Sequence, residues 1–169
     1  MKPKGTCVSL PGDGYGVVLI PKCASRSMEV ALRPDAVSAR VPRRIGFIRE
    51  PLDWLRSFYD FSAVVNRKSF NRIARTTTYQ DMVDAILENE KNLHWELQSS
   101  YDVTEWHLFE DLASVWPTLY PNHPLTLDQW VGRSRSPAPG RQAGYRRNEL
   151  LAFFAADVAI RDSLSKARK

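Results

Sequence analysis

A lysine and several small residues stand where a predicted strand gives way to a predicted helix. Residues 17–20 read Val-Val-Leu-Ile, an apolar run typical of a strand buried on both faces. Lys22 follows this run, and Ala24, Ser25 and Ser27 are small enough for an anion to approach the backbone. The first backbone amides of a helix are unpaired and carry a partial positive charge, and serine hydroxyls add further donors. The sequence therefore predicts a phosphate or sulfate site at this loop.

A second candidate site combines an arginine with a serine eight residues later. Residues 45–48 (Ile-Gly-Phe-Ile) predict a strand, and Arg49 stands directly at its end. Pro51 is typical of the first turn of a helix, which places Ser57 about two turns along that helix. A guanidinium can bind a phosphate through two parallel hydrogen bonds. Arg49 and Ser57 are therefore predicted to hold one phosphate from two sides.

The order of the glycines and the lysine excludes two common nucleotide-binding loops. A Walker A loop has the pattern G-x-x-x-x-G-K-[ST], with its lysine at the far end, whereas Lys22 stands at the near end. A Rossmann fingerprint has its glycines after the strand, but Gly12, Gly14 and Gly16 precede it. These glycines predict a turn.

Both candidate segments resemble elements of sulfotransferases that use 3′-phosphoadenosine 5′-phosphosulfate (PAPS) as donor. Residues 20–28 resemble the 5′-phosphosulfate loop, P-K-x-[GA]-[ST]-x-[ST]-[LIMW], with Arg26 where many relatives carry threonine. Residues 47–59 resemble the 3′-phosphate element and keep its Arg-x-Pro and arginine-to-serine spacings. Glu50 stands where Asp or Asn is more common.

The resemblance implies a set of donor-binding residues and a catalytic role for Lys22. Lys22 would contact the bridging oxygen and stabilise charge on the leaving group, and PAP would be the product. Arg141, in a predicted loop at residues 132–144, would close over the nucleotide. The implied binding residues are Lys22, Cys23, Ala24, Ser25, Arg26, Ser27, Arg49, Ser57 and Arg141.

Two further short segments resemble carbohydrate-type members of this family. Residues 92–98 resemble an H-W-x-x-Q element, and residues 108–112 resemble a strand-end [FY]-E-[DN]-L element. His94 is the first candidate for the catalytic base, because an unperturbed histidine pKa of about 6.5 suits proton transfer. The acceptor stays open as a hydroxyl or amine, with a carbohydrate as one candidate. The alternative bases are Glu96, Asp35 and Glu29.

The elements that position these residues alternate between strands and helices. Such alternation predicts βαβ units. We therefore expect one α/β domain over residues 1–169, with a P-loop-like central parallel sheet flanked by helices. Strands are predicted at residues 17–20, 45–48 and 106–109, and helices at 25–34, 51–62, 79–90, 112–121, 125–131 and 149–165.

Composition and charge narrow the classes of function. The formal net charge of +5 and the pI of about 9.4 favour anionic partners. The sequence contains no recognised nucleic-acid motif, no zinc-type spacing of Cys and His, and no apolar run of about 18 residues. We therefore expect no nucleic-acid partner, no metal and no membrane association. Cys7, Cys23 and the lack of a secretory signal predict a cytoplasmic protein with reduced thiols.

Two other functions remain open. The first is a P-loop-type kinase for a nucleoside or small molecule, against which the position of Lys22 argues. The second is a non-catalytic module that binds a nucleotide or nucleic acid through its basic surface. Two features are compatible with this second function: Arg26 stands where many relatives carry threonine, and no single residue is indicated as the catalytic base. The oligomeric state is not indicated by any pattern.

Overall fold

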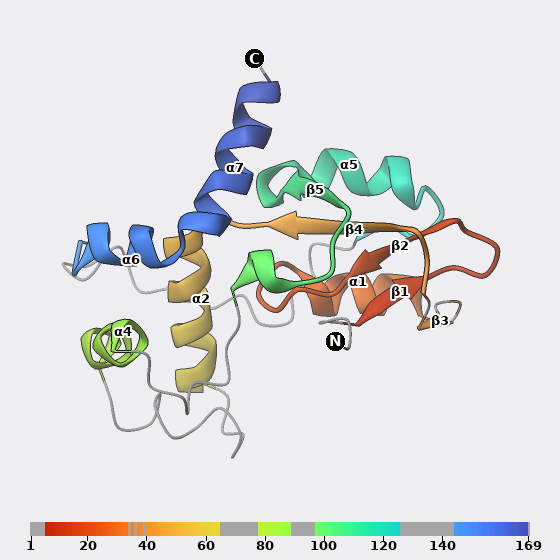
Figure 1. Ribbon diagram of the computed structural model, residues 1–169. Coiled ribbons are helices and arrows are strands. Elements are labelled where there is room, and N and C mark those ends of the chain that lie inside the picture. The colour runs from red at the N-terminus through yellow and green to blue at the C-terminus, as the bar shows by residue number, and fades with distance from the viewer. Residues whose placement is uncertain are drawn as a thin grey trace.

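The structure is a computed structural model that describes residues 6–33, 35, 37–38, 40–64, 78–88, 97–125 and 144–168. Within these ranges the chain forms an open five-stranded sheet flanked by helices (Figure 1). This arrangement confirms the predicted α/β class. No helix in the described ranges has both the length and the apolar character needed to cross a membrane.

The sheet is mixed rather than wholly parallel. Strands β2 (Tyr15–Val18), β4 (Arg43–Ile48) and β5 (Glu105–Leu108) are parallel, as predicted, whereas β1 (Cys7–Ser9) runs antiparallel to both β2 and β3 (Val37–Ser38). The prediction of a parallel sheet is therefore wrong at this edge. The antiparallel pairing follows from the short connection between β1 and β2, which turns at Gly12 with a φ of 89°. A parallel pair would need a crossover of a dozen or more residues. The strand order is β3 (Val37–Ser38), β1 (Cys7–Ser9), β2 (Tyr15–Val18), β4 (Arg43–Ile48) and β5 (Glu105–Leu108).

The helices follow the predicted order. The predicted helix at residues 125–131 lies outside the described residues except for Leu125, and the predicted loop lies outside them except for Gly144. Two short 3-10 helices, η1 (Gln98–Ser100) and η2 (Phe109–Asp111), flank β5 and were not predicted. The first four described α-helices are α1 (Ser25–Leu32), α2 (Pro51–Val64), α4 (Tyr79–Leu87) and α5 (Leu112–Leu119).

The single helix predicted over residues 149–165 is wrong, because two helices occupy this segment. Helices α6 (Arg147–Phe153) and α7 (Ala155–Ala167) meet at Phe154, whose side chain is fully buried and whose φ and ψ are −89° and 21°. The break allows α6 to contact α2 and α4 while α7 contacts β5 and η1. Figure 1 shows α7 projecting from the rest of the chain towards the C-terminus.

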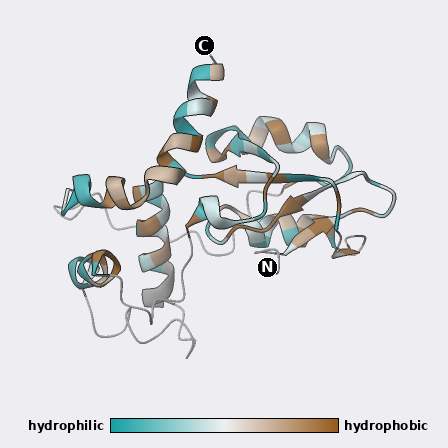
Figure 2. Ribbon diagram, in the orientation of Figure 1, coloured by the Kyte–Doolittle hydropathy of each residue, from teal (hydrophilic) through white to brown (hydrophobic). Residues whose placement is uncertain are grey.

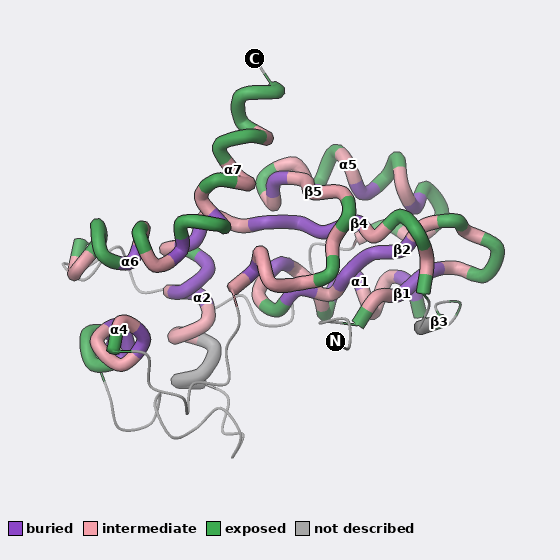
Figure 3. Tube along the Cα trace, in the orientation of Figure 1, coloured by how far each residue is buried: buried purple, intermediate pink, exposed green. Residues whose placement is uncertain are grey.

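Two clusters of buried apolar side chains hold these layers together. Val17 lies in one cluster and Val18 in the other, as expected for a strand that is buried on both faces. Buried stretches follow β2, β4 and the start of α2 (Figure 3), and apolar residues concentrate in the same elements (Figure 2). The first cluster includes Val17, Met28, Ile45, Phe47, Leu112 and Trp116; the second includes Val18, Ile20, Trp54, Leu55, Met82, Ile86 and Phe154.

The starts of α2 and α4 are closed by carboxylate side chains. At α4, Thr78 and Asp81 form a capping box, in which the Asp81 carboxylate accepts from the Thr78 amide at 2.7 Å. At α2, Glu50 Oε2 accepts from the amide of Asp53, also at 2.7 Å. Such acceptors satisfy amides that have no partner inside the helix. The start of α1 is different and belongs to the candidate site.

Candidate anion-binding site

The three parallel strands end side by side at one edge of the sheet. Val17 of β2 pairs with Ile45 of β4, and Ile48 of β4 pairs with Leu108 of β5. The loop before α1, Arg49 and η2 follow these strands and therefore meet at the same edge. In open α/β sheets, ligands bind beyond the carboxyl ends of the strands. Helices α2, α4 and α6 lie beyond this end of β4 (Figure 1).

The loop between β2 and α1 has an unusual backbone. Lys22 and Ala24 have positive φ angles of 66° and 57°, and only one other non-glycine residue in the described ranges, Arg146, shares this property. The amide of Cys23 donates to the carbonyl of Ile20 at 3.1 Å, which closes the loop into a tight turn. Positive φ costs a non-glycine residue about 1–3 kcal/mol and concentrates at functional sites. The loop therefore has a strained backbone of the kind that is typical of functional sites.

Helix α1 begins without a side-chain cap. Its N-cap residue, Ala24, has no polar side chain, and the first turn contains no acidic residue. The first backbone bond of the helix is donated by Met28 to Ala24 at 3.0 Å. Among the described residues, the amides of Ser25 and Arg26 have no acceptor. Like α5, α6 and α7, α1 therefore lacks a side-chain cap, and its positive end lies directly after Lys22.

Lys22 is half-buried close to Arg49. Burial, together with the positive charge of Arg49, lowers the pKa of Lys22 to about 8, whereas Asp60 acts in the opposite direction. An anion that binds between two partly buried cations that repel each other stabilises the charged form of both. The two predicted anion sites, one from each motif, therefore lie close enough for the charges of Lys22 and Arg49 to interact.

Arg49 projects over the aromatic ring of Phe109. Its guanidinium carbon lies 5.5 Å from the ring centroid, and Arg49 forms no ion pair with any residue in the described ranges. The nearby carboxylate of Glu110 is engaged by Arg161, whose two terminal nitrogens lie 3.1 Å from its two oxygens. Arg161 also donates to the carbonyl of Ile48. The Arg49 guanidinium thus has no acidic partner within the described residues, because the neighbouring carboxylate of Glu110 is already paired with Arg161.

A buried glutamine joins the loop to the strand end. Gln98 is fully buried, and its Oε1 accepts from the Arg49 amide at 2.9 Å and from the Cys23 thiol at 3.2 Å. Its Nε2 donates to the Arg49 carbonyl at 3.0 Å. The sequence includes Gln98 in the H-W-x-x-Q element but predicts no role for it. No local pattern indicates these contacts, since the partners are far apart in the chain.

No protein-family model, no curated protein and no solved structure matches the chain.

The other predicted binding residues divide by position. Ser25 and Ser27 lie in the first turn of α1, where Ser27 is buried, and Arg26 is exposed on the same turn. Ser57 is buried on α2, and its hydroxyl has no hydrogen-bond partner within the described part of the chain. Arg141 lies outside the described residues, as does the rest of its segment.

The candidate bases are only partly placed. His94 and Glu96 lie outside the described residues. Glu29 forms an exposed ion pair with Arg33, at 2.8 Å, on α1. Asp35 follows the C-terminal end of α1, whereas the loop precedes its N-terminal end. Within the described ranges no group of three or more His, Cys, Asp and Glu side chains could hold a metal ion.

Replacing Lys22 with methionine is expected to raise the free energy of unfolding at pH 7. The folded-state pKa of about 8 lies below the ordinary lysine value of 10.5, so charging Lys22 opposes folding. This penalty is complete below pH 8 and disappears as the pH rises to about 10.5, because the unfolded chain binds more protons in that window. Urea titrations at pH 7 and pH 10 should show the advantage of Lys22→Met shrinking.

Lys166→Met provides the control, because Lys166 is an exposed lysine in the last turn of α7. It removes the same formal charge without relieving a half-buried one. A stability advantage of Lys22→Met that stayed constant from pH 7 to pH 10 would contradict the assigned cause.

Proposed function

We propose that this protein transfers a sulfuryl group from PAPS to a hydroxyl or amine acceptor. The observation that carries the proposal is that one atom, Gln98 Oε1, accepts from the Cys23 thiol beside Lys22 and from the Arg49 amide, so the two predicted anion sites lie next to each other. PAPS carries a phosphosulfate at its 5′ end and a phosphate at its 3′ position, so it needs two cationic sites near one adenosine. The uncapped start of α1 supplies further donors beside Lys22.

In the proposed reaction the acceptor attacks sulfur in line with the leaving group. The bond between sulfur and the bridging oxygen of the 5′-phosphate breaks, and its electron pair remains on that oxygen. Lys22 and the first amides of α1 stabilise this developing charge, while Arg49 holds the 3′-phosphate. The acceptor's proton passes to a base, for which His94 remains the first candidate and Glu96, Asp35 and Glu29 remain alternatives. PAP leaves as the product.

The direct test is calorimetry with PAP and with adenosine 5′-monophosphate, which lacks the 3′-phosphate. Arg49→Ala is expected to weaken PAP binding by about 10- to 100-fold, since a charge-assisted hydrogen bond contributes about 1.5–3 kcal/mol. The same substitution should change the affinity for the monophosphate by less than about threefold. This difference between ligands isolates the contact to the 3′-phosphate from any general effect on the site.

Arg43→Ala is the matched control. Arg43 begins β4, at the opposite end of the strand from Arg49, and forms an ion pair with Glu105 at 2.6 Å. Its removal deletes the same charge away from the proposed site and should leave both affinities unchanged. A wild-type protein that did not bind PAP would refute the proposal. PAP binding without turnover on sugar, phenol or amine acceptors would instead favour a non-catalytic nucleotide-binding protein.

A further inference from the structure

The Gln98 amide uses both of its polar ends on the two halves of the candidate site. Its oxygen accepts from Arg49 and Cys23, and its nitrogen donates to the Arg49 carbonyl. The paired bonds to the Arg49 amide and carbonyl resemble those of a neighbouring strand, at the point where β4 ends. They fix the backbone direction from which the guanidinium departs.

The contact with Cys23 brings the loop into the same unit. Cys23 lies between Lys22 and Ala24, the two positive-φ residues of the loop, and is fully buried. Burial raises the pKa of the Cys23 thiol to about 12, so the thiol remains protonated and able to donate to Gln98. The buried side-chain carboxamide of Gln98 therefore contacts both proposed anion sites. It bonds to the backbone of Arg49, at the proposed 3′-phosphate site (the 3′ grip), and to Cys23, in the middle of the proposed 5′-phosphosulfate loop at residues 22–24 (the 5′ grip).

Gln98 is itself held in place from the other side of the chain. The backbone amides of Gln98 and Ser99 donate to the two carboxylate oxygens of Asp157, at 3.2 Å and 2.8 Å. Asp157 is fully buried in the first turn of α7. A buried acid with two backbone donors is a costly arrangement to disturb. Helix α7 thus positions η1, and η1 positions the Gln98 side chain.

We propose that Gln98 is a positioning residue that sets the span between the 5′ grip at Lys22 and the 3′ grip at Arg49. This inference rests on the proposed function, because it concerns how one nucleotide is held at both ends. A carboxamide suits both contacts, since its oxygen accepts from the Arg49 amide while its nitrogen donates to the Arg49 carbonyl. Glutamate would lose the donor, and methionine would lose both groups at similar volume.

The inference predicts a loss that depends on the number of phosphates in the ligand. With Gln98 in place, a ligand that carries both phosphates engages both grips without further ordering of the site, so the second phosphate binds at little entropic cost. Gln98→Met is expected to weaken PAP binding by about tenfold. Affinities for adenosine 5′-monophosphate and adenosine 3′-monophosphate, which each need one grip, should change by less than about threefold.

Calorimetry with these three nucleotides on the wild type and Gln98→Met tests the inference. A selective loss for PAP supports it, whereas an equal loss for all three ligands, or no loss, overturns it and leaves the proposed function standing. A wild-type protein that binds none of the three overturns the proposed function and this inference with it.

Cys23→Ala supplies a second test if Gln98→Met does not fold. It removes only the loop-side contact, at 3.2 Å, and keeps both bonds to Arg49. We expect a smaller loss, about threefold, that is again confined to PAP. Cys23→Ser retains a donor at the same position and should restore the selectivity. Equal PAP affinity in Cys23→Ala, Cys23→Ser and the wild type would count against a coupled site.

Discussion

Lys22→Ala is expected to lower turnover by about 100-fold or more, while the affinity for PAP falls by less than about tenfold. In the proposed reaction, negative charge develops on the bridging oxygen only as the bond to sulfur breaks, so Lys22 would act mainly in the transition state. In the proposed complex the first amides of α1 also hold the 5′-phosphate, so binding of PAP in the ground state depends less on Lys22 than turnover does.

Transfer of radiolabelled sulfate from PAPS to a panel of sugar, phenol and amine acceptors measures the turnover. Lys166→Ala is the matched control, because Lys166 is an exposed lysine in the last turn of α7 and belongs to neither proposed anion site. We expect it to keep most of the activity. Turnover by Lys22→Ala at the wild-type rate would refute the role assigned to this lysine, whatever its effect on affinity.

The local parts of the site could be predicted because each depends on a short stretch of sequence. An apolar run predicts a strand, small residues after it predict a tight loop, and Pro51 marks the start of α2. Parallel pairing of β2 with β4 then brings Lys22 and Arg49 to one sheet edge. Three of the five strands are parallel, so the predicted sheet was accurate where the site lies.

The connections between these parts could not be predicted. Gln98 reaches Arg49 and Cys23 across 49 and 75 residues, and Asp157 reaches Gln98 across 59. Hydrogen bonds at such separations leave no periodic signal, because each joins two single residues that only the fold brings together. The same limit applies to the break at Phe154, where tertiary packing overrides a continuous helical pattern.

One departure from the sulfotransferase pattern has a structural explanation. Glu50 replaces the more common Asp or Asn, yet its carboxylate still closes the start of α2 by accepting from Asp53. The carbonyl of Glu50 also accepts from Trp54, at 2.8 Å, as the first bond of the helix. The longer side chain therefore performs the capping role usually taken by shorter residues.

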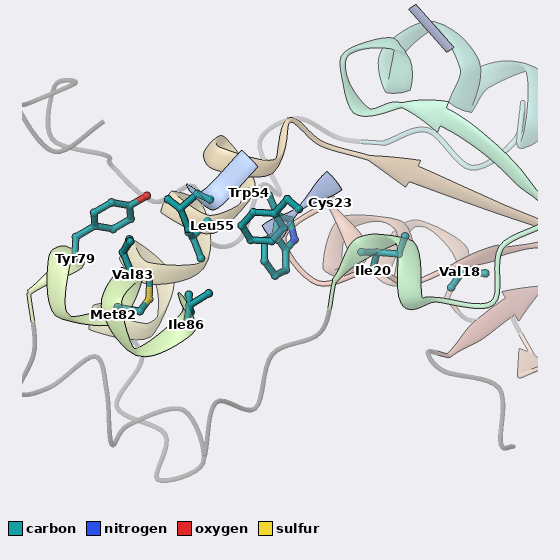
Figure 4. Packing of buried hydrophobic residues seen from close by; sticks show 11 residues of the cluster. Val18, Ile20, Cys23, Trp54, Leu55, Tyr79, Met82, Val83 and Ile86 are labelled. Carbon is teal, nitrogen blue, oxygen red and sulfur yellow. The ribbon is translucent and has the colours of Figure 1, made fainter. Parts of the chain in front are cut away.

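Trp54→Ala is expected to lower the free energy of unfolding by about 3–5 kcal/mol. Trp54 is almost completely buried. Its ring centroid lies 5.7 Å from that of Phe58, in a stacked arrangement, and 6.3 Å from that of Phe154, in an edge-to-face arrangement. Figure 4 shows it beside Cys23 and Leu55 in the cluster that supports the loop. Urea denaturation of the two proteins measures this loss, which combines the lost burial of the indole with the cavity that it leaves.

Trp54→Phe separates the hydrogen bond of the indole from its bulk. The indole nitrogen donates to the carbonyl of Pro21 at 2.8 Å, so phenylalanine leaves that carbonyl without its partner, at a cost of about 1–3 kcal/mol. Trp116→Phe is the matched control, because Trp116 is equally buried and donates to the carbonyl of His123 at 2.7 Å, in the other cluster. Both variants should lose similar stability, but only Trp54→Phe should weaken PAP binding, because Pro21 begins the loop that holds Lys22. Equal PAP affinity in the two variants would mean that the indole stabilises the fold without shaping the site.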